Sequence, residues 1–134
     1  MRYIMLVYET AADLDSRDDP TGDPYVAAWR AYHKALVEAN VYVGGAPLKQ
    51  AATATTVRLR EGRRQVQDGP FAEAKEVLGG FNLIEAEDMD EAVRIASHFP
   101  WVQTGCVEIR PVRDIGAVRH RVGAPPAGAA ASRP

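Results

Sequence analysis

The N-terminal part of the chain is a continuous apolar run, Tyr3-Ile4-Met5-Leu6-Val7-Tyr8. Successive side chains of a β-strand point to opposite faces, so a strand over these residues is apolar on both faces. A half-exposed strand would instead alternate apolar and polar residues. The run therefore predicts a central strand of a sheet that needs a covering layer on each face.

Helix and strand patterns alternate through the rest of the chain. Asp23-Pro24 predicts the start of a helix that runs to about Asn40, because Asp can cap free N–H groups and Pro tolerates the first helical position. A second helix is predicted from Asp88, where Glu91 completes a capping-box pattern, and Pro100 ends it. The expected buried stripes are Tyr25, Val26, Trp29, Tyr32, Leu36 and Val37 in the first helix and Met89, Ala92, Val93, Ala96 and Phe99 in the second.

Further strands are predicted at 41–43, 55–60, 64–67, 81–86 and 106–112. Segments 55–60 and 64–67 flank a turn at Glu61-Gly62-Arg63 and form a hairpin, whose inward side chains would be Val57, Leu59 and Val66. Segment 44–47 is expected to break the second strand. Gly79-Gly80 is expected to end a short helical stretch that follows a turn at 68–70, and segment 9–23 is predicted to be a loop.

The predicted order of elements is β-α-β-β-α-β, with the hairpin inserted after the second strand. This is the split βαβ arrangement of α+β, ferredoxin-like folds, in which an antiparallel sheet carries two helices on one face. Two helices cover one face only, whereas the first strand is apolar on both. We therefore expect a homodimer in which the sheets of two copies pack face to face.

Composition divides the chain into a folded domain, residues 1–112, and a C-terminal tail, residues 113–134. The domain carries 12 basic and 17 acidic side chains, whereas the tail is rich in Ala, Pro and Gly and carries four arginines against one aspartate. The tail is expected to be disordered from Gly123 onward, because nothing there can be buried. An acidic domain has no electrostatic footprint for direct nucleic acid binding, and no apolar run reaches the ~20 residues that span a membrane.

The single cysteine, Cys106, excludes an intramolecular disulfide and agrees with a cytoplasmic location. It lies in a strand-like run and is expected to be a small buried hydrophobe. The three histidines are too dispersed for a metal site, and the chain has no Gly-rich phosphate loop. Neither a metal nor another cofactor is therefore predicted.

Two places in the chain carry candidate chemistry. His33 falls within the apolar stripe of the first helix, where it is either a core histidine bonded to a backbone carbonyl or a group for binding or proton transfer. Segment 68–76 is the densest polar cluster. Asp68 there is either a local cap, with Phe71 packed into the core, or a general base beside a rigid turn and an aromatic ring.

Several separated motifs together resemble the YCII-related family, in particular its DGPF-domain branch. They are Asp68-Gly69-Pro70-Phe71-Ala72-Glu73, Lys75-Glu76, Gly79-Gly80-Phe81 and Glu108-Ile109-Arg110-Pro111-Val112, and segments 3–8 and 54–58 fit as well, so the resemblance covers about residues 1–112. It implies a ferredoxin-like fold that forms a dimeric α/β barrel.

The resemblance also implies candidate residues and a partner. A His and an Asp face a cleft in this family. Asp68 matches the motif of that aspartate, whereas Trp29 occupies the place of the histidine and His33 lies one turn later. Genes of the DGPF branch often lie beside sigma-factor genes, which implies a regulatory partner.

Two functions are compatible with these observations. In the first, a cofactor-independent enzyme carries out proton transfer, an elimination or isomerisation, on a small organic substrate in a cleft between the sheet and the partner subunit. Asp68 and His33 would be catalytic, and the substrate would be bound by Tyr8, Trp29, Phe71, Glu73 and Lys75. In the second, the chain is a non-catalytic module that binds a metabolite or a protein partner and is linked to sigma-factor regulation of transcription.

Overall fold

The computed structural model of the chain describes residues 1–17, 26–71, 74–114 and 116–123. Its strands are β1 (Arg2–Thr10), β2 (Tyr42–Pro47), β3 (Thr55–Arg60), β4 (Arg63–Asp68), β5 (Glu76–Glu85) and β6 (Cys106–Pro111). Its α-helices are α1 (Ala11–Ser16), α2 (Val26–Glu38), α3 (Met89–Ser97) and α4 (Gly116–Arg121), and two short 3-10 helices are η1 (Ala51–Thr53) and η2 (Pro100–Gln103).

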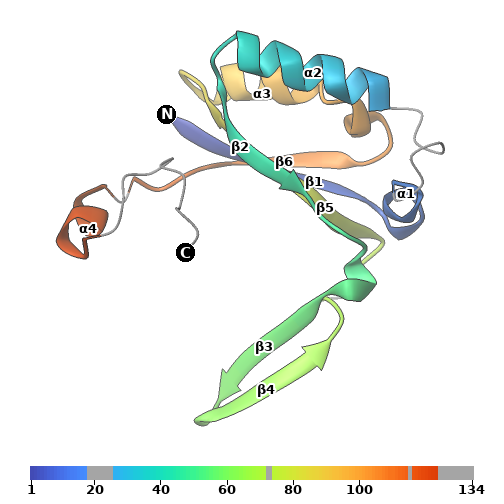
Figure 1. Ribbon diagram of the computed structural model, residues 1–134, viewed down its shortest axis with the longest axis vertical. Helices are drawn as coiled ribbons and strands as arrows, with labels where there is room; N and C mark the ends of the chain where they lie inside the picture. The colour runs from blue at the N-terminus through green and yellow to red at the C-terminus, as the bar shows by residue number, and fades with distance from the viewer. Residues whose placement is uncertain (18–25, 72–73, 115, 124–134) are drawn as a thin grey trace, which may run out of the picture.

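The main sheet has four strands in the order β2-β5-β1-β6, and each neighbouring pair is antiparallel. Helices α2 and α3 both cover one face of this sheet (Figure 1). Strands β3 and β4 form a separate two-stranded sheet that extends away from the main sheet, at the end of the molecule opposite the helices (Figure 1). The α+β, ferredoxin-like order with an inserted hairpin is thus confirmed.

Burial along β1 alternates, and this alternation shows where the core lies. Tyr3, Met5 and Val7 are buried on the face toward the helices. Ile4 and Leu6 point to the other face and are half-buried. The residues that complete the core cluster with β1 come from β5, α3 and the segment between them: Ile84, Ala86, Ala92 and Ala96. The predicted central strand is confirmed, but only one of its faces is covered by the described residues of this chain.

The glycine-rich segments lie within strands, which corrects two predictions: that 44–47 breaks the second strand and that Gly79-Gly80 ends a short helical stretch. Gly44 and Gly45 lie within β2, and Gly79 and Gly80 lie within β5. A Cβ atom on Gly45 would lie 2.4 Å from the carbonyl oxygen of Phe81. The glycines therefore allow close approach of neighbouring groups in the sheet, a role that the local sequence does not distinguish from a turn.

Two other local predictions are wrong. No helix occurs in the described part of 68–80, where Asp68 ends β4 and Glu76 begins β5. The predicted loop 9–23 instead contains the end of β1 and helix α1, because Thr10 caps this helix by accepting a hydrogen bond from the N–H of Asp13 at 3.1 Å. Residues 18–25, which include the predicted helix start at Asp23-Pro24, lie outside the described residues.

Several side chains that were expected to be buried are exposed. On the hairpin, Val57, Leu59 and Val66 are 63%, 67% and 57% exposed, because no layer of the described chain covers it. The exposed apolar side chains on the helices are Val37, Met89 and Val93, which lie at the outer edges of the predicted stripes. Cys106 is exposed as well, since β6 is an edge strand.

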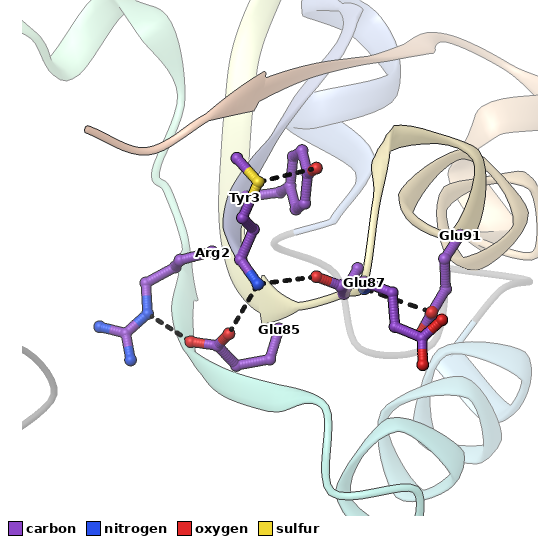
Figure 2. Close-up of polar contacts among 7 residues, drawn as sticks. Arg2, Tyr3, Glu85, Glu87 and Glu91 are labelled. Atoms are coloured by element: carbon purple, nitrogen blue, oxygen red, sulfur yellow. Dashed lines mark hydrogen bonds and ion pairs between the residues drawn. The ribbon is translucent and has the colours of Figure 1, made fainter. Parts of the chain in front are cut away.

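The N-terminus of α3 is capped by Asp88 as the sequence predicts. The carboxylate of Asp88 accepts from the N–H of Glu91 at 2.9 Å. The carboxylate of Glu91 in turn accepts from the N–H of Glu87 at 3.3 Å (Figure 2). Nearby, Arg2 Nε donates to Glu85 Oε1 at 3.0 Å and joins β1 to β5 (Figure 2). Polar contacts therefore fix the turn between β5 and α3.

Residues 116–121 of the predicted tail form helix α4. The disorder expected from Gly123 onward concerns residues that, after Gly123 itself, lie outside the described ones. None of the described helices has the length and hydropathy of a membrane span.

Candidate functional site

A cavity of about 110 Å³ lies between the sheet, α2 and η2. We call it the aromatic cavity, because five of its described lining residues are aromatic: Trp29, Tyr42, Phe81, Phe99 and Trp101. The remaining ones are Val7, Gly45, Ala46, Pro47, Gly80 and Asn82. A largely apolar concave wall with few polar groups is typical of a site for a small organic molecule.

Stacked rings form one side of the aromatic cavity. The rings of Trp29 and Trp101 have centroids 6.4 Å apart and are inclined by 19°. Trp29 also stacks on His33, with centroids 5.2 Å apart and an angle of 13°. His33 in turn meets Tyr42 edge to face at 4.6 Å. Trp29 and His33 of α2 therefore form one cluster of contacting rings with Tyr42 and Trp101, which line the cavity.

A buried ion pair stands behind this wall. Glu9 is 1% exposed and accepts from Arg17 Nη2 at 2.8 Å. The guanidinium of Arg17 lies 4.9 Å from the ring centroid of Trp101, a cation–π arrangement. Gly79 leaves space for the carboxylate, because a Cβ there would lie 2.6 Å from Glu9 Oε1. The guanidinium of Arg17 thus contacts both the carboxylate of Glu9 and the ring of Trp101.

Asn82 is the only described lining residue of the aromatic cavity that carries an amide. It lies on β5 opposite Met5 of β1 and Gly45 of β2. Met5 is fully buried on the helix-covered face, so Asn82 points to the same face. A side-chain amide offers both a donor and an acceptor. The cavity therefore combines stacked rings with several neutral hydrogen-bonding groups: the amide of Asn82, the hydroxyl of Tyr42 and the indole N–H groups, of which that of Trp101 is buried without a partner among the described residues.

A second and larger cavity, about 680 Å³, lies at the base of the hairpin. We call it the hairpin cavity; it is lined among others by Tyr8, Lys49, Phe71 and Glu76. Phe71 is 76% exposed and is covered on one side by the guanidinium of Arg58 at 4.9 Å. The two cavities have no described lining residue in common.

Acidic groups surround the hydroxyl and thiol groups near the hairpin cavity. Tyr8 Oη donates to Glu108 Oε1 at 3.3 Å, and Cys106 Sγ donates to Glu76 Oε2 at 3.3 Å. Partial burial, together with Glu108, raises the pKa of the Tyr8 hydroxyl. The hydrogen bond to Glu76 is the main cause that raises the pKa of the Cys106 thiol. Both groups are therefore held in their protonated forms, which disfavours Cys106 as a thiolate nucleophile.

The candidate site residues predicted from the sequence lie in different parts of the structure. Trp29 lines the aromatic cavity and His33 packs against its wall, whereas Tyr8 and Phe71 line the hairpin cavity. The exposed residues Asp68 and Lys75 line neither cavity, and Glu73 lies outside the described residues. In a single chain Asp68 is not brought to His33, because the hairpin and α2 lie at opposite ends of the molecule (Figure 1).

Sequence reasoning missed four residues at the aromatic cavity: Glu9, Arg17, Asn82 and Trp101. The signal for Asn82 was a polar residue inside an otherwise apolar strand, Phe81-Asn82-Leu83-Ile84. The signal for Glu9 was a carboxylate directly after a continuous apolar run. Among the described residues, no three His, Cys, Asp or Glu side chains are grouped closely enough to hold a metal ion.

Comparison with known proteins agrees with the fold. An uncharacterised protein from Rhizobium meliloti (strain 1021) is 32% identical over 114 residues, which cover 84% of this chain and 92% of that protein. A solved structure, 5-chloro-2-hydroxyhydroquinone dehydrochlorinase from Burkholderia phenoliruptrix AC1100 in complex with 2,5-dihydroxybenzoquinone, is similar with a TM-score of 0.50. It is 19% identical and covers 84% of this chain and 94% of its own, so the likeness shows a shared fold.

The family is decided by the sequence itself. The model of the YCII-related domain matches residues 1–116, most of the chain and all of the described sheet. The protein therefore belongs to the YCII-related family.

Proposed function

We propose that the protein binds a small planar organic molecule in the aromatic cavity. The observation that carries this proposal is the wall of nearly parallel rings, Trp29 and Trp101, beside Asn82. Aromatic rings attract one another in offset-stacked or edge-to-face geometry within about 4.5–7 Å. An apolar cavity of roughly 150 Å³ can hold benzene; the aromatic cavity is somewhat smaller, at about 110 Å³, so one ring is the largest ligand we propose for it.

The structural neighbour supports this choice of ligand. It was solved with 2,5-dihydroxybenzoquinone, a planar ring that carries oxygen substituents. A shared fold at 19% identity does not transfer a substrate. It does identify a rational first probe for this chain.

We extend the proposal to proton-transfer chemistry with His33 as the proton-transfer group. An imidazole has one ring nitrogen that can accept a proton and one that can donate it. His33 contacts Trp29 and Tyr42, which both line the aromatic cavity. The neighbour's name, a dehydrochlorinase, denotes an elimination, the class of reaction predicted here.

The catalytic role of Asp68 and the binding roles of Glu73 and Lys75 stay predictions from the sequence. Asp68 would need to approach a cavity across a subunit boundary, since it lines neither cavity of its own chain. The alternative function, a binding module linked to a sigma factor, likewise stays a prediction from the family resemblance, as does the cytoplasmic location.

We also propose that the protein is a homodimer. The open face of the main sheet, the face without helices, presents apolar side chains such as Ile4, Leu6 and Leu83, which are only half-buried. The separate hairpin sheet also exposes three apolar side chains. Exposed apolar surface of this kind is often covered by a partner, and a two-fold axis lets one patch cover its own copy.

The ligand proposal is tested by titrating the 15N-labelled protein with 2,5-dihydroxybenzoquinone. The chain has two tryptophans, so each indole N–H resonance is assigned with one substitution, Trp101→Phe. We expect saturable shifts of both indole resonances. Shifts confined to residues of the hairpin cavity, such as Tyr8 and Phe71, would reject the aromatic cavity as the site.

A further inference from the structure

We infer that Asn82 selects the ligand by hydrogen bonding, and that the aromatic cavity takes planar rings bearing an uncharged hydroxyl or carbonyl oxygen. This inference rests on the proposed function, because it assumes that a ring occupies the cavity. The inference adds the chemical class of the ring and identifies Asn82 as the residue that recognises its oxygen atom.

The position of Asn82 is unusual for a polar residue. It faces the helix-covered side of a central strand, where its cross-strand neighbour Met5 is fully buried. Its side chain makes no hydrogen bond to any described residue, and it is half-buried beside the cavity. The amide is half-buried and faces the cavity without a partner among the described residues, so its hydrogen-bonding groups are available to a molecule that enters the cavity. An oxygen atom on a bound ring would supply that partner.

Gly45 defines the space in which the amide lies. A Cβ on Gly45 would lie 2.4 Å from the carbonyl oxygen of Phe81 and 2.7 Å from Asn82 Oδ1, so a larger residue there would shift both the strand and the amide. At the adjacent Gly44, a Cβ would meet nothing within 4 Å. A side chain at position 45 would therefore contact the Asn82 amide and its strand, whereas a side chain at position 44 would not. Gly45 and Gly44 thus provide a test position and a matched control.

Charge distinguishes the ligand class further. None of the described lining residues is charged. The ion pair of Glu9 and Arg17 does not belong to the described lining. A carboxylate or ammonium group entering this wall would lose hydration without gaining a counter-charge, which is costly. A phenol or a carbonyl oxygen needs only one neutral hydrogen bond, and the amide of Asn82 can give or accept it.

The experiment compares three one-ring probes, phenol, toluene and benzoate, by 1H–15N titration. With the wild-type protein we expect toluene and phenol to shift the indole N–H resonances of Trp29 and Trp101, phenol to bind more tightly, and benzoate to have no effect. The side-chain NH₂ resonances of Asn82 should shift with phenol and not with toluene. This wild-type measurement needs no variant that might alter folding.

Two substitutions and a control complete the test. Asn82→Leu, which keeps the approximate volume, should weaken phenol binding about five- to tenfold, as expected for one lost hydrogen bond, and leave toluene binding unchanged or tighter. Gly45→Ala should weaken the binding of both probes, because it shifts the β5 backbone that lines the cavity together with the amide, while Gly44→Ala should leave the binding of both unchanged.

The outcomes separate this inference from the proposal on which it rests. If no probe shifts the tryptophan resonances of the wild type, ring binding at the cavity is wrong. If toluene and phenol bind equally well, or if Asn82→Leu weakens both to the same degree, ring binding stands and the role of Asn82 is rejected.

Discussion

Glu9 is a charged residue that lies almost completely buried, at 1% exposed. Carboxylates are almost never fully buried unless they are paired, and Glu9 is paired with Arg17 at 2.8 Å. Its position at the end of β1 continues the buried face of Tyr3, Met5 and Val7. The strand alternation therefore forces position 9 into the interior, and the ion pair makes a glutamate tolerable there.

Replacing Glu9 with Gln should lower the free energy of unfolding by about 3–5 kcal/mol, because it removes the buried carboxylate that pairs with the guanidinium of Arg17. Urea denaturation at pH 7 measures this loss. Glu85→Gln is the matched control, since Glu85 pairs with Arg2 at 3.0 Å but is 45% exposed. An exposed pair contributes about 0–1 kcal/mol. Equal losses in the two variants would contradict the interpretation of Glu9 as a buried ion-pair partner.

The two main helices are joined by one specific polar contact. Tyr32 of α2 donates a hydrogen bond from its hydroxyl to the carbonyl oxygen of Ile95 in α3 at 2.8 Å. Its ring also meets Phe99 edge to face at 5.3 Å. Burial raises the pKa of the Tyr32 hydroxyl above its ordinary value. The position of α2 over the cavity therefore depends on a neutral, hydrogen-bonded tyrosine.

Tyr32→Phe should cost about 1 kcal/mol at pH 7, because the hydrogen bond from the Tyr32 hydroxyl to the Ile95 carbonyl is lost, although that carbonyl still accepts from the N–H of His98. The raised pKa means that the folded state keeps its proton after the unfolded chain has released it. This contribution of Tyr32 is fully present below about pH 10, the ordinary pKa of tyrosine, and is lost as the pH rises further. Unfolding curves at pH 7 and pH 11 should therefore show the difference between wild type and variant becoming smaller. A constant difference would contradict this coupling.

Within the whole molecule, the helices cover one face of the sheet and leave the other open (Figure 1). The open face and the hairpin together expose the apolar side chains that the described chain cannot cover. Cavity and open face lie on opposite sides of the same sheet. The proposed dimer would therefore cover the open face without closing the aromatic cavity.

Light scattering after size exclusion should give the wild-type protein about twice its chain mass of 14.6 kDa. Val57→Glu on the hairpin and Leu6→Glu on the open face should shift the mass toward that of one chain. Val37→Glu is the control, because Val37 is equally apolar and 52% exposed but lies on α2. A monomeric wild type, or dissociation by Val37→Glu as well, would reject the proposed interface.

The helix and strand order, and part of the site, could be predicted because they depend on local patterns. The apolar run at 3–8, the capping pattern at Asp88 and the turn at Glu61-Gly62 all involve neighbours in the chain. Trp29 and His33 were found because helical periodicity directs them toward the sheet. Asp68 and Phe71 were found by motif, and a motif carries no information on which cavity a residue faces.

The sequence by itself determined the family, the order of the elements and the apolar excess of the central strand, since periodicity and motifs depend on neighbouring residues. Only the tertiary structure decided that glycines at 44–45 and 79–80 continue strands and that Glu9 is buried against Arg17. It also brought Asn82 beside Trp29 and Trp101. These results depend on contacts between residues that are far apart in the chain, and the space available at such contacts is set by packing of the whole domain.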